Sequence, residues 1–398
     1  MSSIAVLRIV SLAWLVLLAR PASSPSEPAQ SVRLVATLRT PRAAHTATTL
    51  PSGQVLVVGG MAESGGSVAS VELFDPAYNT VQELGSLAER RAGHTATLLA
   101  DGRVLIAGGY DGGYLASLEV FEPSTRRFRP AGTLQEGRSG QTATLLRDGR
   151  VLFVGGVGRG WTFLRSAELY DPESGRSESV GWMSVPRESH TATLLTDGRV
   201  LVIGGHSGRR QDMEVYASTE VFAPRTRRFE TAGTLATARH KHDAIELADG
   251  RVLVIGGADR TDRVHYATTE IYSPSTETFA RGPSMANRRY KIAGTSILLP
   301  SSDVLVTSGA EVAELLDVGR WAFREVAGRF PAAYRFAAAA LLPEGDVLVV
   351  GGYSDRNQNT AGVWRWSGSL APGATTPALP SFRVQPGPLG DPPRPRTR

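Results

Sequence analysis

The chain has 398 residues, of which 41% are hydrophobic and 20% charged, with 43 Gly and no Cys. This apolar content can build a sizeable core and excludes a mainly disordered chain, while the absence of Cys excludes disulfides, thiolate metal sites and cysteine nucleophiles. The formal charge is +5, and only Lys241 and Lys291 of the 43 basic residues are lysines.

The two ends of the chain differ in composition from its middle. In residues 1–30, Arg8 precedes the uncharged apolar run Ile9–Ala19, which is too short to span a bilayer and typical of a secretory signal. We expect cleavage within 22–30 and a secreted or periplasmic bacterial protein with no transmembrane segment. Residues 368–398 are rich in proline and are predicted to be a disordered tail. Without these ends the net charge is about +1, so nucleic-acid binding is not expected.

Between the ends, an apolar run closed by Gly-Gly recurs about every 48 residues. Its seven copies are Val55–Gly60, Val104–Gly109, Val151–Gly156, Val200–Gly205, Val252–Gly257, a degenerate Val304–Gly309 and Val347–Gly352.

Each repeat is predicted to form four antiparallel strands, which we name a, b, c and d in chain order. Strand a is His45–Leu50 in the first repeat, and an Asp-Gly pair such as Asp101-Gly102 favours a tight hairpin turn into strand b. Strand b is apolar throughout, so both of its faces must be covered. Strand c, such as Val71–Pro76, ends at a proline. Strand d, such as Phe128–Leu134, carries charge and proline and is predicted to be the outer edge.

Seven such units predict an all-β, seven-bladed β-propeller over residues 31–367. The last repeat begins near Ala337 and supplies only strands a, b and c. Its missing outer strand is predicted to be Val32–Leu38, which matches Phe128–Leu134 and would close the ring, with Phe382–Leu389 as a weaker rival.

The Gly-Gly end of strand b, the Glu-x-[Phe/Tyr]-[Asp/Glu]-Pro strand c and the phrase Ala192–Leu201 resemble kelch repeats, most closely those of bacterial secreted proteins. The resemblance covers about 32–366, although Phe mostly replaces the family's outer-strand Trp. It implies a binding scaffold or, less often, an oxidase or a sugar-processing enzyme. Because the chain has no Cys, it cannot form the Tyr–Cys crosslink of copper-radical oxidases of the galactose-oxidase type.

Antiparallel connectivity places the b–c and d–a connections on one face of the propeller, which we call the b–c/d–a face. Since its b–c loops vary in length and chemistry, we expect any ligand site there. A near-ring of cations precedes strand a: Arg42, Arg91, Arg138, Arg187, Arg239 and, less regularly, Lys291.

These arginines have two interpretations, which the sequence leaves open. They could bind a carboxylate, and the resemblance to kelch proteins that grip acidic peptides suggests this for Arg91, Arg138, Arg187 and Arg239. Alternatively they are scaffold residues that pair with the strand-c residues Glu72, Glu119, Glu168, Glu220 and Glu270. The repeated His45, His94, His190 and His242 are interpreted as scaffold.

Residues that do not repeat are better candidates for ligand contacts, because Arg and aromatic side chains suit sugar stacking or peptide binding. On the b–c/d–a face these are Arg159, Trp161, His206, Arg209, Arg210, Tyr216, Arg260, Arg263, His265, Tyr266, Tyr353 and Arg356, with Tyr110 and Tyr114 on the same side. His240, His242 and His265 could share Cu or Zn, but no suitably spaced carboxylate completes the set. No cofactor and no catalytic residue is therefore predicted.

The function predicted from the sequence is that of an exported, non-catalytic, monomeric propeller. Its predicted ligand is an anionic carbohydrate or an acidic protein segment. The alternatives are a periplasmic sugar-processing enzyme of epimerase or mutarotase type and a purely structural envelope protein.

Overall fold

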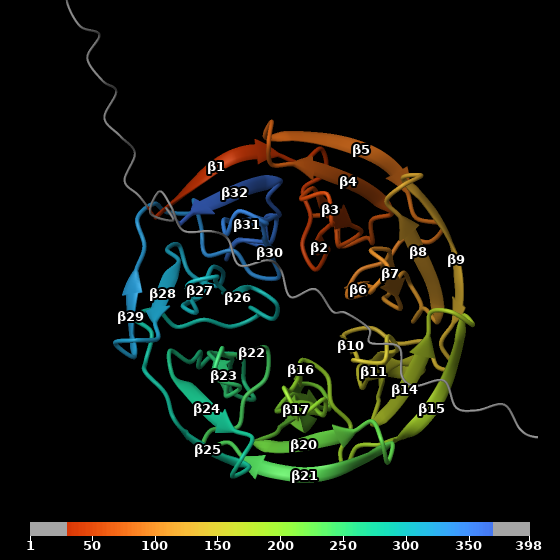
Figure 1. The fold of residues 1–398 in the computed structure, drawn as a ribbon, viewed down its shortest axis with the longest axis vertical. Helices are drawn as coiled ribbons and strands as arrows, with labels where there is room; N and C mark the ends of the chain where they lie inside the picture. The colour runs from red at the N-terminus through yellow and green to blue at the C-terminus, as the bar shows by residue number, and fades with distance from the viewer. Residues whose placement is uncertain (1–29, 369–398) are drawn as a thin grey trace, which may run out of the picture.

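The computed structural model describes residues 30–368 and arranges them as a ring of seven four-stranded antiparallel sheets (Figure 1). The predicted signal segment and proline-rich tail lie outside the described residues, apart from Gln30 and Gly368. Within 30–368, no helix has the length and hydropathy needed to cross a membrane.

Strands a to d of each blade follow one another outward from the axis of the ring. Blade 1 contains β2 (Thr46–Thr49), β3 (Val55–Val58), β4 (Ser70–Asp75) and β5 (Thr80–Ser86). Blade 2 contains β6 (Thr95–Leu98), β7 (Val104–Ala107), β8 (Ser117–Glu122) and β9 (Arg127–Thr133). Blade 3 contains β10 (Thr142–Leu145), β11 (Val151–Val154), β14 (Ser166–Asp171) and β15 (Arg176–Trp182). Blade 4 contains β16 (Thr191–Leu194), β17 (Val200–Ile203), β20 (Ser218–Ala223) and β21 (Arg228–Thr234).

The remaining blades include the degenerate repeat and the closing sheet. Blade 5 contains β22 (Asp243–Glu246), β23 (Val252–Ile255), β24 (Thr269–Ser273) and β25 (Thr278–Arg281). Blade 6 contains β26 (Ser296–Leu298), β27 (Val304–Val306), β28 (Glu314–Asp317) and β29 (Ala322–Glu325). Blade 7 contains β30 (Ala338–Leu341), β31 (Val347–Val350), β32 (Gly362–Ser367) and β1 (Ser31–Thr37).

The prediction that the N-terminal strand closes the ring is confirmed. β1 pairs antiparallel with β32 from Ser31↔Ser367 to Thr37↔Gly362, so the two ends of the folded region lie in one sheet (Figure 1). Every residue of the b strands is buried, as their continuous apolar sequence predicted. Their side chains pack between adjacent blades, so the core is a set of seven layers, one at each blade junction.

Two b–c connections contain structure that the sequence did not predict. In blade 3, β12 (Val157–Gly158) and β13 (Thr162–Phe163) form a ribbon around η1, a 3-10 turn over Arg159–Trp161. In blade 4, β18 (His206–Ser207) and β19 (Glu214–Val215) flank a second such turn, η2 (Arg210–Asp212).

Three of the four repeated histidines, His94, His190 and His242, connect the inner strands of neighbouring blades, and His45 is likewise buried, which supports their interpretation as scaffold. His94 Nε2 lies 3.2 Å from Thr46 Oγ1, and His190 Nε2 lies 3.1 Å from Thr142 Oγ1. Burial and, secondarily, a nearby guanidinium lower the pKa of His45, His94 and His190 to about 3.

These lowered pKa values predict a loss of stability in mild acid. The unfolded chain takes up these protons below about pH 6.5 and the folded chain resists them, so stability should fall as pH drops from about 6.5 toward 3. Blade 3 has Gln141 at the same position, where its amide donates to the Ala107 carbonyl at 2.9 Å. A His94→Gln variant should therefore lose less melting temperature than wild type between pH 7 and pH 4. Identical pH slopes in thermal unfolding would refute this.

Candidate functional site

The predicted b–c/d–a face is present, because isolated bridges join the two kinds of connection blade by blade. Among them are Ala92↔Tyr110, Glu188↔His206, His240↔Ala258 and Arg335↔Tyr353. Residues from the two connections therefore lie together around the axis, as the antiparallel connectivity predicted.

The near-ring of arginines belongs to the scaffold. Arg42, Arg91, Arg138, Arg187 and Arg239 are 0% exposed, and each guanidinium contacts the strand-c Glu of the blade that follows it. Each also donates to backbone carbonyls, as Arg138 does to Gly155 O at 2.9 Å. These groups are already paired and covered, so the prediction that Arg91, Arg138, Arg187 and Arg239 contact a ligand is contradicted by their burial.

The sixth member of this set is Arg289 and not Lys291. Arg289 is 0% exposed and lies 2.9 Å from Glu314. A spacing rule would have found it, because each buried arginine follows a buried apolar residue by four positions, as Arg289 follows Met285 and Arg138 follows Leu134. Lys291 therefore does not belong to the ring of buried arginines.

The two lysines occupy equivalent positions in a second ring, two residues after the buried arginine. This position has a left-handed φ of 48° to 67° in every blade and is filled by Ala44, Gly93, Gly140, Ser189, Lys241, Lys291 and Phe336. Backbone N–H groups of six of these residues donate to the carbonyl of the preceding member, for example Lys291 N to Lys241 O at 2.8 Å. The result is a belt of amides around the axis, and both lysines of the chain project from it.

One residue earlier, the side chains change from small to polar around the ring. Blades 1 to 3 have Ala43, Ala92 and Ser139, whereas blades 4 to 7 have Glu188, His240, Tyr290 and Arg335. We call the one-sided set made by the residues at both positions the mouth cluster: Glu188, Ser189, His240, Lys241, Tyr290, Lys291, Arg335 and Phe336, together with Tyr353 of the blade 7 b–c loop. A fold requirement would repeat in all blades, and this set does not.

Lys291 is half-buried among aromatic rings. Its Nζ donates to Tyr353 Oη at 2.6 Å and lies 5.1 to 5.5 Å from the ring centres of Tyr290, Phe336 and Tyr353. No carboxylate of residues 30–368 lies within ion-pair distance of it, whereas Lys241 binds Asp262 and Arg335 binds Asp355. Burial raises the pKa of Tyr353, so this phenol stays neutral and does not balance the lysine charge.

Next to the lysines, four titratable side chains form a connected group. His206 Nδ1 lies 3.1 Å from His240 Nδ1 and 3.4 Å from Glu188 Oε2, and His240 Nε2 lies 3.1 Å from Asp262 Oδ1. Burial opposes ionisation of Asp262, but hydrogen bonds from His240 and Lys241 hold its pKa well below the usual value. Burial, followed by the charge of His240, lowers the pKa of His206 to about 3, and burial raises the pKa of Glu188.

A partly exposed aromatic cluster lies on the same face, in the b–c loops of blades 2 to 4. Trp161 is 50% exposed and has a left-handed φ of 64°. The Arg209 guanidinium stacks 3.7 Å from its ring centre, and Tyr114 and Tyr110 approach it at 5.8 and 6.3 Å. Three b–c loops thus bring together four residues singled out in the sequence.

The other predicted contacts divide into buried and exposed groups. Tyr216 and Tyr266 cover the buried Arg187 and Arg239, each with the guanidinium 5.3 Å from the ring centre, so they support the scaffold. His265 stacks on Tyr290 at 3.6 Å. The exposed side chains are Arg159, Arg210, Arg260, Arg263 and Arg356, of which Arg356 lines a polar cavity of about 530 Å³ beside the shortened b–c loop of blade 6.

The sequence contains a match to the Kelch motif family model over residues 90–135. No curated protein matches the chain. Among solved structures, the chain is similar to a fungal alcohol oxidase of the AA5 family in complex with copper, with 14% identity and a TM-score of 0.66. The similarity covers 85% of this chain and 76% of that one, and at this identity it shows the fold.

The residues of this chain do not fit a copper centre. The three histidines considered from the sequence have separate partners: His240 bonds His206, His242 bonds Thr191, and His265 bonds the Asp262 carbonyl. Within the described range, no three His, Cys, Asp or Glu side chains are grouped to hold a metal ion.

Proposed function

The chain is a kelch-type β-propeller of seven blades, and we propose that it acts after export as a non-catalytic binding module for an anionic ligand. The ligand is an acidic carbohydrate or an acidic protein segment, and it binds at the mouth cluster. The signal-like residues 1–30 support export, which N-terminal sequencing of the mature protein would test.

One observation carries the binding proposal: the repeat is broken on one side of the mouth only. Apart from Ser189, blades 4 to 7 place charged and aromatic side chains where blades 1 to 3 have Ala, Gly and Ser. Since rigid scaffolds place binding residues at positions that the fold leaves free, this sector is where recognition is built.

The sign of the ligand follows from the charges of this sector. Lys241 and Arg335 already have carboxylate partners, and Lys291 has only a neutral phenol. A half-buried ammonium group gains most from an anion that can replace the water it has lost. The exposed Arg356, with the Gln358 amide beside it, provides further donors next to the mouth, in a cavity whose lining also includes the carboxylates of Glu311 and Asp355.

A Lys291→Ala variant should therefore bind acidic ligands at least about tenfold more weakly, because a charge-assisted hydrogen bond contributes about 1.5–3 kcal/mol. Oligogalacturonates and glutamate-rich peptides would be titrated by calorimetry against wild type and variant. The matched control is Arg320→Ala, which removes a cation that is 83% exposed on blade 6 and pairs only with Asp317. Equal weakening by both substitutions, or no binding of either ligand by wild type, would contradict the proposal.

A further inference from the structure

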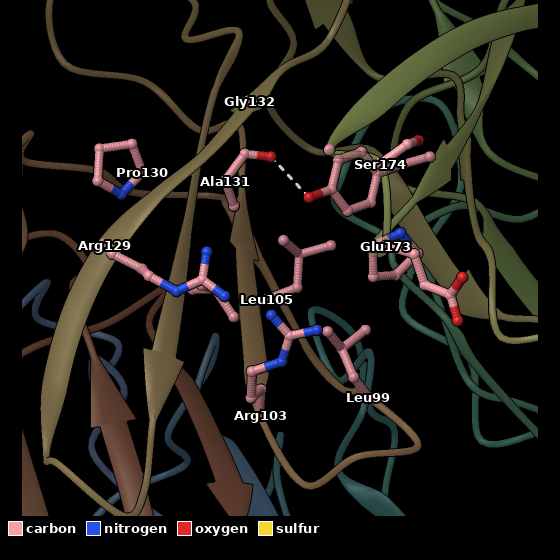
Figure 2. A pocket seen from close by; sticks show the side chains of 13 residues that line it. Leu99, Arg103, Leu105, Arg129, Pro130, Ala131, Gly132, Glu173 and Ser174 are labelled. Carbon is pink, nitrogen blue, oxygen red and sulfur yellow. Dashed lines mark hydrogen bonds between the residues drawn. The ribbon is translucent and has the colours of Figure 1, made fainter.

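On the opposite face of the propeller, one cavity lies at a position that a side chain fills at another junction between blades. It lies between blades 2 and 3, has a volume of about 470 Å³, and is lined by Leu105, Arg103, Arg129, Tyr170 and the c–d turn that ends at Gly175 (Figure 2). No site was predicted on this face, because its a–b turns are short and four of the seven are Asp-Gly.

At two other junctions a side chain occupies this position. There, the arginine that follows the Asp-Gly turn of one blade meets the left-handed residue of the c–d turn in the next blade, whereas at the junction of blades 3 and 4 that residue is Arg227, which binds Glu178. At the junction of blades 4 and 5, Arg199 Nη1 lies 2.8 Å from Glu277 Oε1. At the junction of blades 5 and 6, the Arg251 guanidinium lies 5.1 Å from the ring centre of Trp321.

At the junction of blades 2 and 3, the turn residue is Gly175, which has no side chain to place there. Gly175 and Glu277 are equivalent, because both have a left-handed φ (69° and 54°) and both donate their backbone N–H four residues back, to Asp171 and Ser273. The cavity is therefore equivalent to the space that the Glu277 carboxylate fills at the junction of blades 4 and 5.

The guanidinium groups that could donate hydrogen bonds to a carboxylate in this space are present. Arg103 uses Nε for Asp101 at 2.6 Å, as Arg199 uses Nε for Asp197 at 2.7 Å, and no partner in residues 30–368 takes its Nη groups. Arg129 likewise binds Glu122 through Nε, at 2.6 Å. Figure 2 shows both guanidinium groups projecting into the cavity, near the Ala131 carbonyl that accepts from the Tyr170 hydroxyl at 2.6 Å. Glu173 is the carboxylate at the exposed rim.

We propose that this cavity binds the carboxylate of a ligand, held by Arg103 and Arg129 as Glu277 is held by Arg199. The internal repeat supports this assignment, since Arg199, the equivalent arginine in the equivalent turn of blade 4, already binds a carboxylate within this chain. A planar guanidinium with free Nη groups matches a carboxylate in geometry and charge. This site is separate from the mouth cluster and does not depend on it.

The first test needs no ligand and compares Gly175→Glu with Gly175→Gln. A Cβ at Gly175 would lie 3.6 Å from its nearest neighbour, the Ala131 carbonyl oxygen, so both side chains fit and both meet the same backbone strain. If Arg103 receives carboxylates here, the Glu variant should melt roughly 1–2 °C above the Gln variant at low salt, and 1 M salt should remove the difference. Equal melting temperatures at low salt would overturn the proposal.

The second test measures binding by calorimetry with two probes, glutarate and a Gly-Ser peptide that carries one Glu. At least one probe should bind wild type, and Arg103→Ala and Gly175→Glu should each weaken it at least tenfold. Glu277→Gly should create a second site at Arg199. Arg320→Ala, which removes an exposed cation paired with Asp317, should leave this binding unchanged, and any signal that Lys291→Ala removes belongs instead to the mouth cluster.

The pattern of probe binding identifies the source of the carboxylate. Binding of glutarate indicates a small carboxylate ligand, and binding of the peptide alone indicates an acidic protein segment. If neither probe binds, or if Gly175→Glu binds as wild type does, the proposal is wrong.

Discussion

A Glu168→Ala substitution is expected to destabilise the propeller by about 3–5 kcal/mol, because it removes the buried counter-charge of a buried guanidinium and leaves only the half-exposed Glu136 at 3.8 Å. Arg138 is 0% exposed and lies 2.7 Å from Glu168. The same carboxylate accepts the backbone N–H groups of Gln135 at 2.7 Å and Glu136 at 3.2 Å, and the Ser177 hydroxyl at 2.7 Å. Its loss would orphan all four donors, which chemical unfolding would detect as a lower midpoint.

The matched control is another Arg–Glu pair at the surface. Arg329 and Glu311 lie 2.9 Å apart with side chains 67% and 52% exposed, so Arg329→Ala should cost no more than about 1 kcal/mol. If Glu168→Ala proved as mild as this control, the buried pairs would not hold the blades in the way we describe.

The chain contains its own precedent for replacing such a pair. In blade 7, Tyr334 follows the buried Phe330 by four residues, as Arg138 follows Leu134, and Trp364 pairs with Val349 as Glu168 pairs with Phe153. The ring centres of Tyr334 and Trp364 lie 5.0 Å apart, so an aromatic pair occupies the place of the ion pair. Changing Arg138 and Glu168 together to this pair should therefore cost less than Glu168→Ala alone, since no charge is left buried.

The fold could be predicted from the sequence because the information is repeated seven times. The apolar b strand recurs in all seven units, the Asp-Gly turn in four and the proline-ended c strand in five, and even the closing strand β1 was recognisable from its match to Phe128–Leu134. Repetition also explains why the buried arginines could not be interpreted: a residue required by every blade looks the same in one sequence whether it faces a ligand or a glutamate.

The candidate sites were harder to predict, because they depend on which residues of different blades meet. Lys291 was placed in the arginine ring, although the four-residue spacing from Met285 selects Arg289, which is the residue that contacts Glu314 in the structure. Tyr216 and Tyr266 are blade-specific, yet their rings cover buried guanidinium groups. The Arg103 cavity results from a single glycine in an otherwise regular turn, and the sequence alone does not show that the space left there stays open.

The closure of the ring predicts the second large effect, which is the loss of stability when β1 is removed. β1 supplies the outer strand of blade 7, where Val32 is 6% exposed in the layer with Phe330, Trp364 and Trp366. Val32 N also donates to Ala327 O at 2.9 Å, and Leu38 N to Ala361 O at 2.7 Å. Deleting residues 1–38 would expose these apolar groups and the edge of β32, and we expect a loss of about 5 kcal/mol or more.

Two comparisons make this prediction specific to the closing strand. Deleting only 1–29 keeps every described strand and should leave the melting temperature unchanged. Within β1, Val32→Asp places a charge in the core, whereas Leu34→Asp changes a side chain that is 58% exposed, so only the first should lower the melting temperature strongly. If the deletion variant is insoluble, these point variants still decide the matter. Equal stability of Val32→Asp and Leu34→Asp would mean that pairing of the chain ends does not stabilise the ring, and that the seven layers of blade packing suffice.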